Sequence, residues 1–160
     1  MKGILKIAVM LVFSTLCLLL YQCGLIEEFY GFRIKNESGH SIAHYVATTK
    51  PDGFVYPDTT LPASSRYVIF GDPRFNVFYW DIREPLADFF KKNLLVDTMS
   101  VYIFHPDTLA KYSWDEVRND YMILRRYDLS LKNVEQHNFT VIYPPDSTMK
   151  NIKMYPPYGQ

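Results

Sequence analysis

The chain has 160 residues, with 17 basic and 17 acidic side chains and aromatic residues at 16% of its positions. This length suits one domain, and a balanced charge without a basic stripe argues against a nucleic-acid partner. Cys17 and Cys23 are the only cysteines, so no disulfide can cross-link the residues after Cys23. Small extracellular domains of higher organisms usually contain disulfides, and we therefore expect a bacterial envelope protein.

The N-terminus has the layout of an export signal. Lys2 and Lys6 form a basic head, and no residue from Ile7 to Tyr21 is charged. We favour cleavage before Cys23 and lipidation of that cysteine, because Cys23 lies where a lipid-bearing cysteine would. Leu20 supplies the aliphatic residue expected three positions earlier. The two intervening residues, 21 and 22, depart from the small residues usual at such a site. A lipid on Cys23 would tether the protein to a membrane.

Two other interpretations of this segment stay open. Residues 7–26 number 20, about the length needed to cross a bilayer, so the segment could stay uncleaved as an anchor. Cys23 would then be an ordinary small hydrophobe of a membrane helix. Ordinary signal cleavage would release a soluble protein, but residues 18–22 fit its small-x-small site poorly. We accordingly divide the chain into a signal peptide or membrane anchor (1–22), a tether (23–30), a β-rich globular domain (31–145) and a Pro-rich C-terminal tail (146–160).

The first half of the domain is predicted to be mostly extended. Alternation of Phe32 and Ile34 with basic residues indicates a half-buried strand, and residues 42–47 continue it as a hairpin across the turn 36–39. Three prolines favour a loop over 49–64. Strands are expected at 67–70 and 75–80. A helix beginning near Pro85 should turn Leu86, Phe89 and Phe90 inward and end at Lys91 and Lys92.

The second half combines strands with short helices. Residues 99–104 alternate clearly and predict a strand, which His105 to Thr108 should end. Ser113 and Glu116 form a capping-box pattern, followed by an apolar face of Trp114, Val117, Tyr121 and Leu124. We expect an extended segment over 123–128, a helix over 131–137 capped by Ser130, and a last strand over 139–143. The tail from Pro144 should lie along the surface or be partly disordered.

These elements predict a mainly β fold. We expect a single β-sandwich or open-barrel-like domain with two or three short helices, preceded by the N-terminal hydrophobic signal or anchor helix.

Four groups of polar residues contain side chains that take part in catalysis or metal binding in other proteins. His40 and His44 lack a third metal ligand in pattern, and His105 with Asp107 reads as a strand-ending turn. The carboxylates of Asp81, Glu84 and Asp88 suit a solvated helix face, and Ser64 and Ser65 lack the glycines of a nucleophile elbow. We therefore predict no catalytic, metal-binding or cofactor-binding residue and no cofactor, and we do not expect an enzyme.

The segment from Asp107 to Tyr127, which continues as Asp128-Leu129-Ser130-Leu131, resembles a family of small uncharacterised lipoproteins from Bacteroidetes-type bacteria. The resemblance extends to residues 140–145, to 152–158 and to the motif at 57–62. It implies export and lipid anchoring at Cys23, and it supplies no catalytic residues.

Two functions are consistent with this sequence. The first is a membrane-tethered, non-catalytic envelope lipoprotein that acts as a protein-interaction module, which should expose a contiguous aromatic patch. The alternative is a glycan- or small-ligand-binding envelope module, in which Asn76, Asp81 or Arg83 could donate or accept hydrogen bonds beside stacked aromatic rings. The expected partners are the membrane and another envelope protein or a glycan. Glu27 and Glu28, shortly after Cys23, resemble a surface-export signal of this bacterial group.

Overall fold

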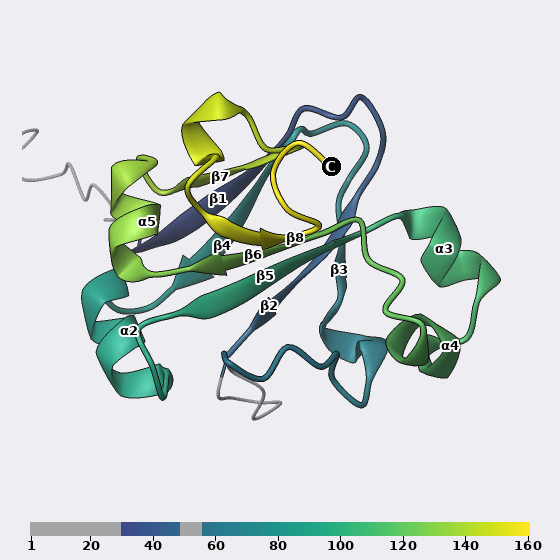
Figure 1. Ribbon diagram of the computed structural model, residues 1–160, viewed down its shortest axis with the longest axis horizontal. Coiled ribbons are helices and arrows are strands. Elements are labelled where there is room, and N and C mark those ends of the chain that lie inside the picture. The colour runs from purple at the N-terminus through teal and green to yellow at the C-terminus, as the bar shows by residue number, and fades with distance from the viewer. Residues whose placement is uncertain (1–29, 49–55) are drawn as a thin grey trace, which may run out of the picture.

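The computed structural model describes residues 30–48 and 56–160, and the strands of these residues form two sheets (Figure 1). The first sheet has three strands in the order β4-β1-β7, with β1 antiparallel to β4 and parallel to β7. Its strands are β1 (Tyr30–Asn36), β4 (Val77–Ile82) and β7 (Thr140–Tyr143).

The second sheet has five antiparallel strands in the order β3-β2-β5-β6-β8. Its strands are β2 (Ala43–Ala47), β3 (Ile69–Phe70), β5 (Met99–Phe104), β6 (Arg125–Leu129) and β8 (Lys153–Tyr155). The expectation of a sheet-rich domain with short helices is therefore confirmed.

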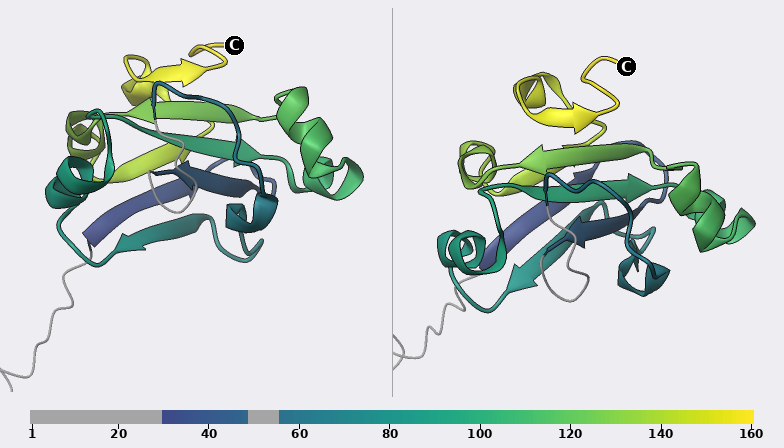
Figure 2. Two further views of the ribbon diagram at one scale, coloured as in Figure 1. Left: turned by 90° about the horizontal axis from the view of Figure 1, so that it is seen from below. Right: turned by 60° about the horizontal axis from the view of Figure 1, so that its bottom comes forward.

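The described residues form four α-helices, one more than the upper number predicted, and two 3₁₀ turns. They are α2 (Leu86–Asn93), α3 (Pro106–Lys111), α4 (Trp114–Asn119), α5 (Leu131–Gln136), η1 (Ser65–Tyr67) and η2 (Ser147–Met149). Figure 2 shows α2 and α5 together at one end of the sheets and α3 with α4 at the opposite end. None of the helices in these ranges has the length and apolarity needed to cross a bilayer. The predicted hydrophobic signal or anchor lies outside the described residues.

Local sequence explains where the helices begin. In α4, Ser113 Oγ accepts from the Glu116 amide at 3.3 Å, and Glu116 accepts from the Ser113 amide at 2.8 Å, so the predicted capping box is confirmed. Ser130 and Asn133 form an equivalent box on α5. Helix α2 follows Pro85 and buries Leu86 and Phe90, as its spacing predicted, whereas Phe89 is partly buried. Lys91 and Lys92 lie in its last turn.

One hydrophobic cluster contains side chains from both sheets and from both helices of the α2/α5 end. Its buried members include Phe32, Ile34, Val101, Ile103, Leu129, Leu86, Phe90 and Val134. A second cluster covers the other face of the five-stranded sheet and includes Tyr45, Tyr102, Phe104 and Val117. Strand β5 is consequently buried at every position, because its two faces contact different clusters.

The predicted hairpin of residues 32–35 with 42–47 is wrong. β1 pairs with β4 and β7, whereas β2 pairs with β3 and β5, so the turn at 36–41 carries the chain from one sheet to the other. The physical reason is burial. Arg33 and Lys35 give β1 a half-exposed polar face, whereas β2 is buried almost throughout and suits the interior of the larger sheet.

The segment after Pro144 also differs from the prediction of a surface or partly disordered tail. It forms β8, which pairs with β6 through Tyr127 and Met154, and its Met149, Ile152 and Met154 are buried. Arg125 contributes to this docking. Its guanidinium donates to the main-chain oxygens of Pro156, of Pro157 at 3.3 Å and of Gln160 at 3.0 Å.

Several boundaries shift for identifiable reasons. The strand expected at 67–70 is the 3₁₀ turn η1 followed by the two-residue β3, and the strand expected at 75–80 runs over 77–82. Tyr121 has a positive φ of 51°, which ends the helical face before Leu124. Phe139 also has a positive φ, of 55°, so β7 begins one residue later than predicted.

Candidate functional site

A groove of about 560 Å³ lies beside the α2/α5 end of the molecule. We call it the β1 groove, because β1 contributes three of its lining residues. The lining residues are Tyr30, Gly31, Arg33, Tyr79, Pro85, Leu86, Ala87, Leu131, Glu135 and Phe139. Its volume lies within the range of small-ligand pockets.

The alternation of β1 places its polar face in this groove. Phe32 and Ile34 are fully buried in the core, so Arg33 faces the opposite side of the sheet. The register sets Arg33 between Tyr79 on β4 and Thr140 on β7. Arg33 and Tyr79, which is 65% exposed, are therefore cross-strand neighbours on the same face of the sheet.

The chain after α5 forms the far wall. The Arg33 amide donates to the Phe139 carbonyl at 2.8 Å, and the Arg33 guanidinium donates to the Asn138 carbonyl at 2.9 Å. Asn138 and Phe139 both have positive φ angles, which turn the chain back toward β1. The Phe139 ring stays 40% exposed in the groove.

The groove thus offers three aromatic rings (Tyr30, Tyr79 and Phe139), one guanidinium group and the Glu135 carboxylate. Such a lining can stack against a flat apolar face and hydrogen-bond polar groups at its rim. The lining contains no serine, cysteine or histidine that could act as a nucleophile or general base.

A second hollow, of about 350 Å³, lies between the turns at 36–41 and 71–76. Its polar groups mostly bond within those turns. Asn36 donates to the His40 carbonyl at 2.6 Å and accepts from Ser38, and Arg74 pairs with Asp72 at 2.6 Å. The bonded Arg74 guanidinium holds the pKa of the Asp72 carboxyl below its usual value.

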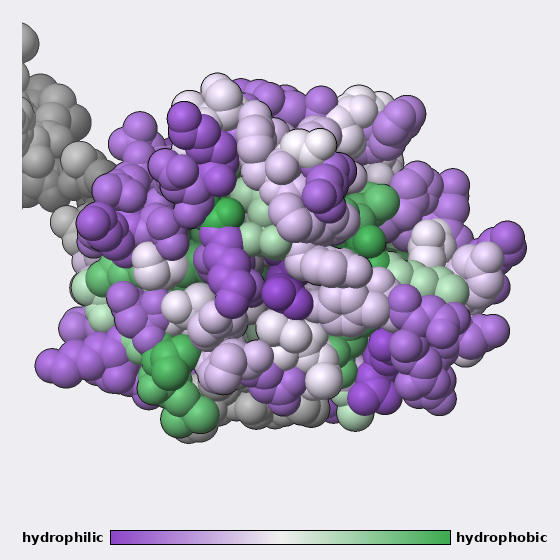
Figure 3. Space-filling model, in the orientation of Figure 1, coloured by the Kyte–Doolittle hydropathy of each residue, from purple (hydrophilic) through white to green (hydrophobic). Residues whose placement is uncertain are grey.

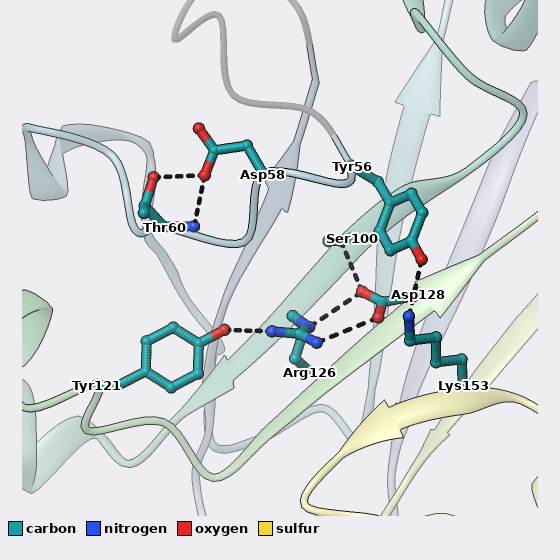
Figure 4. Close-up of polar contacts among 8 residues, drawn as sticks. All are labelled: Tyr56, Asp58, Thr60, Ser100, Tyr121, Arg126, Asp128 and Lys153. Atoms are coloured by element: carbon teal, nitrogen blue, oxygen red, sulfur yellow. Dashed lines mark hydrogen bonds and ion pairs between the residues drawn. The ribbon is translucent and has the colours of Figure 1, made fainter.

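A cluster of charged side chains on the five-stranded sheet has a structural role (Figure 4). The Asp128 carboxylate is buried and accepts from Ser100 at 2.8 Å and from Arg126 at 3.0 and 3.2 Å. Arg126 also donates to the Tyr121 hydroxyl at 2.6 Å. The buried ion pair therefore has hydrogen-bond partners on both sides, as such pairs require.

The same face holds the segment that follows residue 55. Lys153 on β8 donates to the Tyr56 hydroxyl at 2.8 Å, and Asp58 accepts from the amide and hydroxyl of Thr60 at 2.9 and 2.7 Å (Figure 4). Burial raises the pKa of the nearby Tyr102 above its usual range, with a smaller contribution from Tyr121. The Lys153–Tyr56 contact joins β8 to the segment that follows residue 55.

The structure separates most residues that the sequence singled out. Cys23, Glu27 and Glu28 lie outside the described residues. His40 lies in the exposed turn, whereas His44 is buried against Phe78, with ring centroids 5.7 Å apart. No group of three or more potential metal-ligating side chains occurs in the described ranges.

The other candidates cap or solvate elements. His105 accepts from the Asp107 amide at 3.2 Å and so caps α3. Ser64 accepts from Arg66 and caps η1. Glu84 bonds Lys92 at 2.7 Å and Asn93 at 3.1 Å, and this contact with Lys92 lowers the pKa of the Glu84 carboxyl.

The hydrogen-bonding residues proposed for a glycan site are not brought together. Asn76 precedes β4 and lines the second hollow, whereas Asp81 lies near the other end of β4 and Arg83 follows that strand. Sequence reasoning missed Arg33, Tyr79, Glu135 and Phe139. The alternation of β1 already turned Arg33 away from the core, but only the sheet register places it beside Tyr79.

We compared the chain with models of protein families, with curated proteins and with solved structures, and none of the three comparisons gave a match.

Proposed function

We propose that this chain is a membrane-tethered, non-catalytic binding module of the bacterial cell envelope. The N-terminal segment supports the tether, with a basic head at Lys2 and Lys6, an uncharged run to Tyr21 and a cysteine at position 23. In this proposal Cys23 carries a lipid, as in the Bacteroidetes-type lipoproteins that the sequence resembles. The two sheets would close as a β-sandwich around their shared hydrophobic cluster.

The β1 groove is the observation that favours binding of a glycan or small ligand. It is concave, its volume of about 560 Å³ suits a compact ligand, and two of its rings stay exposed. Arg33 and Glu135 supply charges of opposite sign at the same place. A ligand with a flat apolar face and hydroxyl groups would match both the rings and the charges, and sugars have this character.

A protein-interaction module is the second candidate. It predicted a contiguous aromatic patch, but the exposed aromatic residues of the described chain are distributed over several elements: Phe70, Phe75, Tyr79, Phe139, Tyr155 and Tyr158. This distribution weakens the hypothesis of a broad flat interface. The exposed Ile69 and Phe70 on the edge strand β3 still support a smaller contact with a protein partner.

The binding test uses the full-length protein in detergent or nanodiscs on an array of envelope and dietary glycans. For any glycan that binds, Tyr79→Ala and Phe139→Ala should each weaken the affinity about tenfold, which corresponds to roughly 1.4 kcal/mol. Tyr158→Ala is the matched control, because that ring is exposed outside the groove. Equal losses in all three variants would contradict the site. Co-purification of a stoichiometric protein with no glycan bound would favour the second candidate.

The tether is tested separately through Cys23. If the cysteine carries the lipid, mass spectrometry of the N-terminal peptide should show an acylated Cys23, and Cys23→Ala should abolish both cleavage and acylation. If the segment stays as an uncleaved helix, the parent and the variant should retain residues 1–22 and the same membrane association.

A further inference from the structure

The loop between α2 and β5 exposes two neighbouring aliphatic side chains. Leu95 is 79% exposed and Val96 is 40% exposed. Single exposed leucines are common and need no explanation, but this pair lies on a loop that hydrogen bonds hold in place at one end of the molecule. The space-filling view shows a hydrophobic protrusion beside the lower end of α2 (Figure 3).

The structure holds this loop in place. Leu94 packs against the main hydrophobic cluster. The Thr98 amide donates to the Val96 carbonyl at 2.7 Å, and the Asp97 carboxylate accepts from the Leu131 amide of α5 at 3.4 Å. The loop is thus fixed on both sides, and Leu95 and Val96 project from a supported turn.

The pair lies at the end of the molecule where the described chain begins. Tyr30, the first residue of β1, pairs with Ile82, the last residue of β4, and β4 is followed by α2. Met99, the first residue of β5, pairs with Leu129, the last residue of β6, and β6 is followed by α5. The start of β1, both helices and the 94–98 loop therefore share one end (Figure 2). Six residues separate Cys23 from Tyr30, and this stretch reaches about 25 Å when fully extended.

Charged side chains of both signs surround the aliphatic pair. Lys91 and Lys92 occupy the last turn of α2, and Lys132 lies in the first turn of α5. Asp88, Asp97 and Glu135 are the acidic neighbours on the same elements, and Glu84 pairs with Lys92. The near balance of these charges means that insertion of the aliphatic pair, more than attraction to anionic lipid, would drive contact.

We propose that Leu95 and Val96 form a membrane-contact tip, which inserts into the headgroup–acyl boundary of the bilayer that holds the N-terminal anchor. Two aliphatic side chains bind a bilayer too weakly to recruit a free protein. The short tether raises their effective concentration at the surface, so the weak contact can orient the domain with α2 and α5 toward the membrane. This inference rests on the membrane tether of the proposed function.

The test uses the full-length protein in phosphatidylethanolamine–phosphatidylglycerol vesicles, with the photocrosslinker p-benzoylphenylalanine at position 95. The control places the same probe at position 70, because Phe70 is also exposed but lies on β3, outside the α2/α5 end. We expect lipid adducts at position 95 to exceed those at position 70 at least tenfold. The ratio should change less than twofold between 0.05 and 0.5 M salt, since charge is not the main attraction.

A second pair of variants separates loss of contact from loss of folding. With the probe at position 96, Leu95→Glu should reduce lipid adducts at least fivefold, whereas Phe70→Glu should leave them unchanged. Both substitutions are at exposed positions and should preserve the fold. If the protein floats with the vesicles but gives equal lipid adducts at positions 95 and 70, the membrane-contact tip is overturned and the tether is not. Failure of the parent protein to float with vesicles would overturn the tether as well.

Discussion

Gly31 shows how a single residue determines the pairing of β1 with β4. Its φ of +150° is rare for residues with side chains, and a Cβ built on it would lie 2.0 Å from the Trp80 carbonyl oxygen. We expect Gly31→Ala to reduce the free energy of unfolding by about 3 kcal/mol or more. Alanine at this φ would be strained, and its Cβ would also force the backbone of β1 or β4 to move. Urea denaturation measures this loss.

Gly39→Ala is the matched control for Gly31→Ala. Gly39 also has a positive φ, of +75°, but a Cβ added to it in the turn would meet no other atom within 4 Å. Strain without a clash should cost about 1–2 kcal/mol. Equal losses for the two alanine variants would show that the close approach of Gly31 to β4 is not what constrains it.

His44 makes the stability of the fold depend on pH. It is 2% exposed beside Phe78, and burial lowers its pKa to about 4 from a usual value of 6.5. Between these two values the unfolded chain binds the proton more readily, so stability should decrease as the pH falls from about 6.5 toward 4. The decrease attributable to His44 should approach 3 kcal/mol, and stability should level off above pH 7.

The measurement is urea denaturation of the parent and of His44→Phe at several pH values from 4 to 7.5. Exposed carboxylates with lowered pKa values, such as Asp72 and Glu116, also lose stabilising interactions in acid, so only the difference between the two proteins isolates His44. Parallel pH profiles for the two proteins would contradict the prediction.

At the scale of elements, Arg125 determines whether β8 stays on the sheet. The guanidinium is almost fully buried and bonds three main-chain oxygens after β8. Arg125→Met should keep the apolar contacts but lose these bonds, which should reduce stability by about 2–3 kcal/mol. Amide exchange should accelerate most in residues 153–160.

Arg74→Met provides the control, because Arg74 forms an exposed ion pair with Asp72. Exposed pairs contribute little, so stability should change by less than about 1 kcal/mol and exchange in 153–160 should stay as in the parent. Uniformly faster exchange throughout Arg125→Met, with no preference for β8, would show that Arg125 supports the whole sheet instead.

At the scale of the whole molecule, the C-terminal segment completes the core. Met149, Ile152 and Met154 belong to the cluster shared by the two sheets. Each buried side chain of this size contributes about 1.5–3 kcal/mol, so their combined loss approaches the total stability of an ordinary domain. We expect a chain that stops after residue 145 to lose its cooperative unfolding transition and its near-ultraviolet circular dichroism signal. This expectation differs from the sequence prediction, which placed the whole globular domain within 31–145.

The control for the shortened chain is the 160-residue chain, produced in the same way. A second variant, Met154→Ala in the complete chain, should remain folded but lose about 2–4 kcal/mol. A cooperative transition of similar midpoint in the shortened chain would show that β8 is an accessory strand.

The sequence by itself determined the local elements whose signals lie within a few residues. The Ser113–Glu116 box, the inward face of Leu86 and Phe90 and the strand at 99–104 follow from contacts or periodicity that neighbouring residues define. Only the tertiary structure decided which strands pair. Long-range pairing depends on the burial of both faces of a strand, and β1 and β2 therefore belong to different sheets. Met154 likewise pairs with Tyr127, which lies 27 positions earlier in the sequence. The β1 groove depends on the same long-range register, because Arg33 meets Tyr79 and Phe139 only after three distant segments have paired.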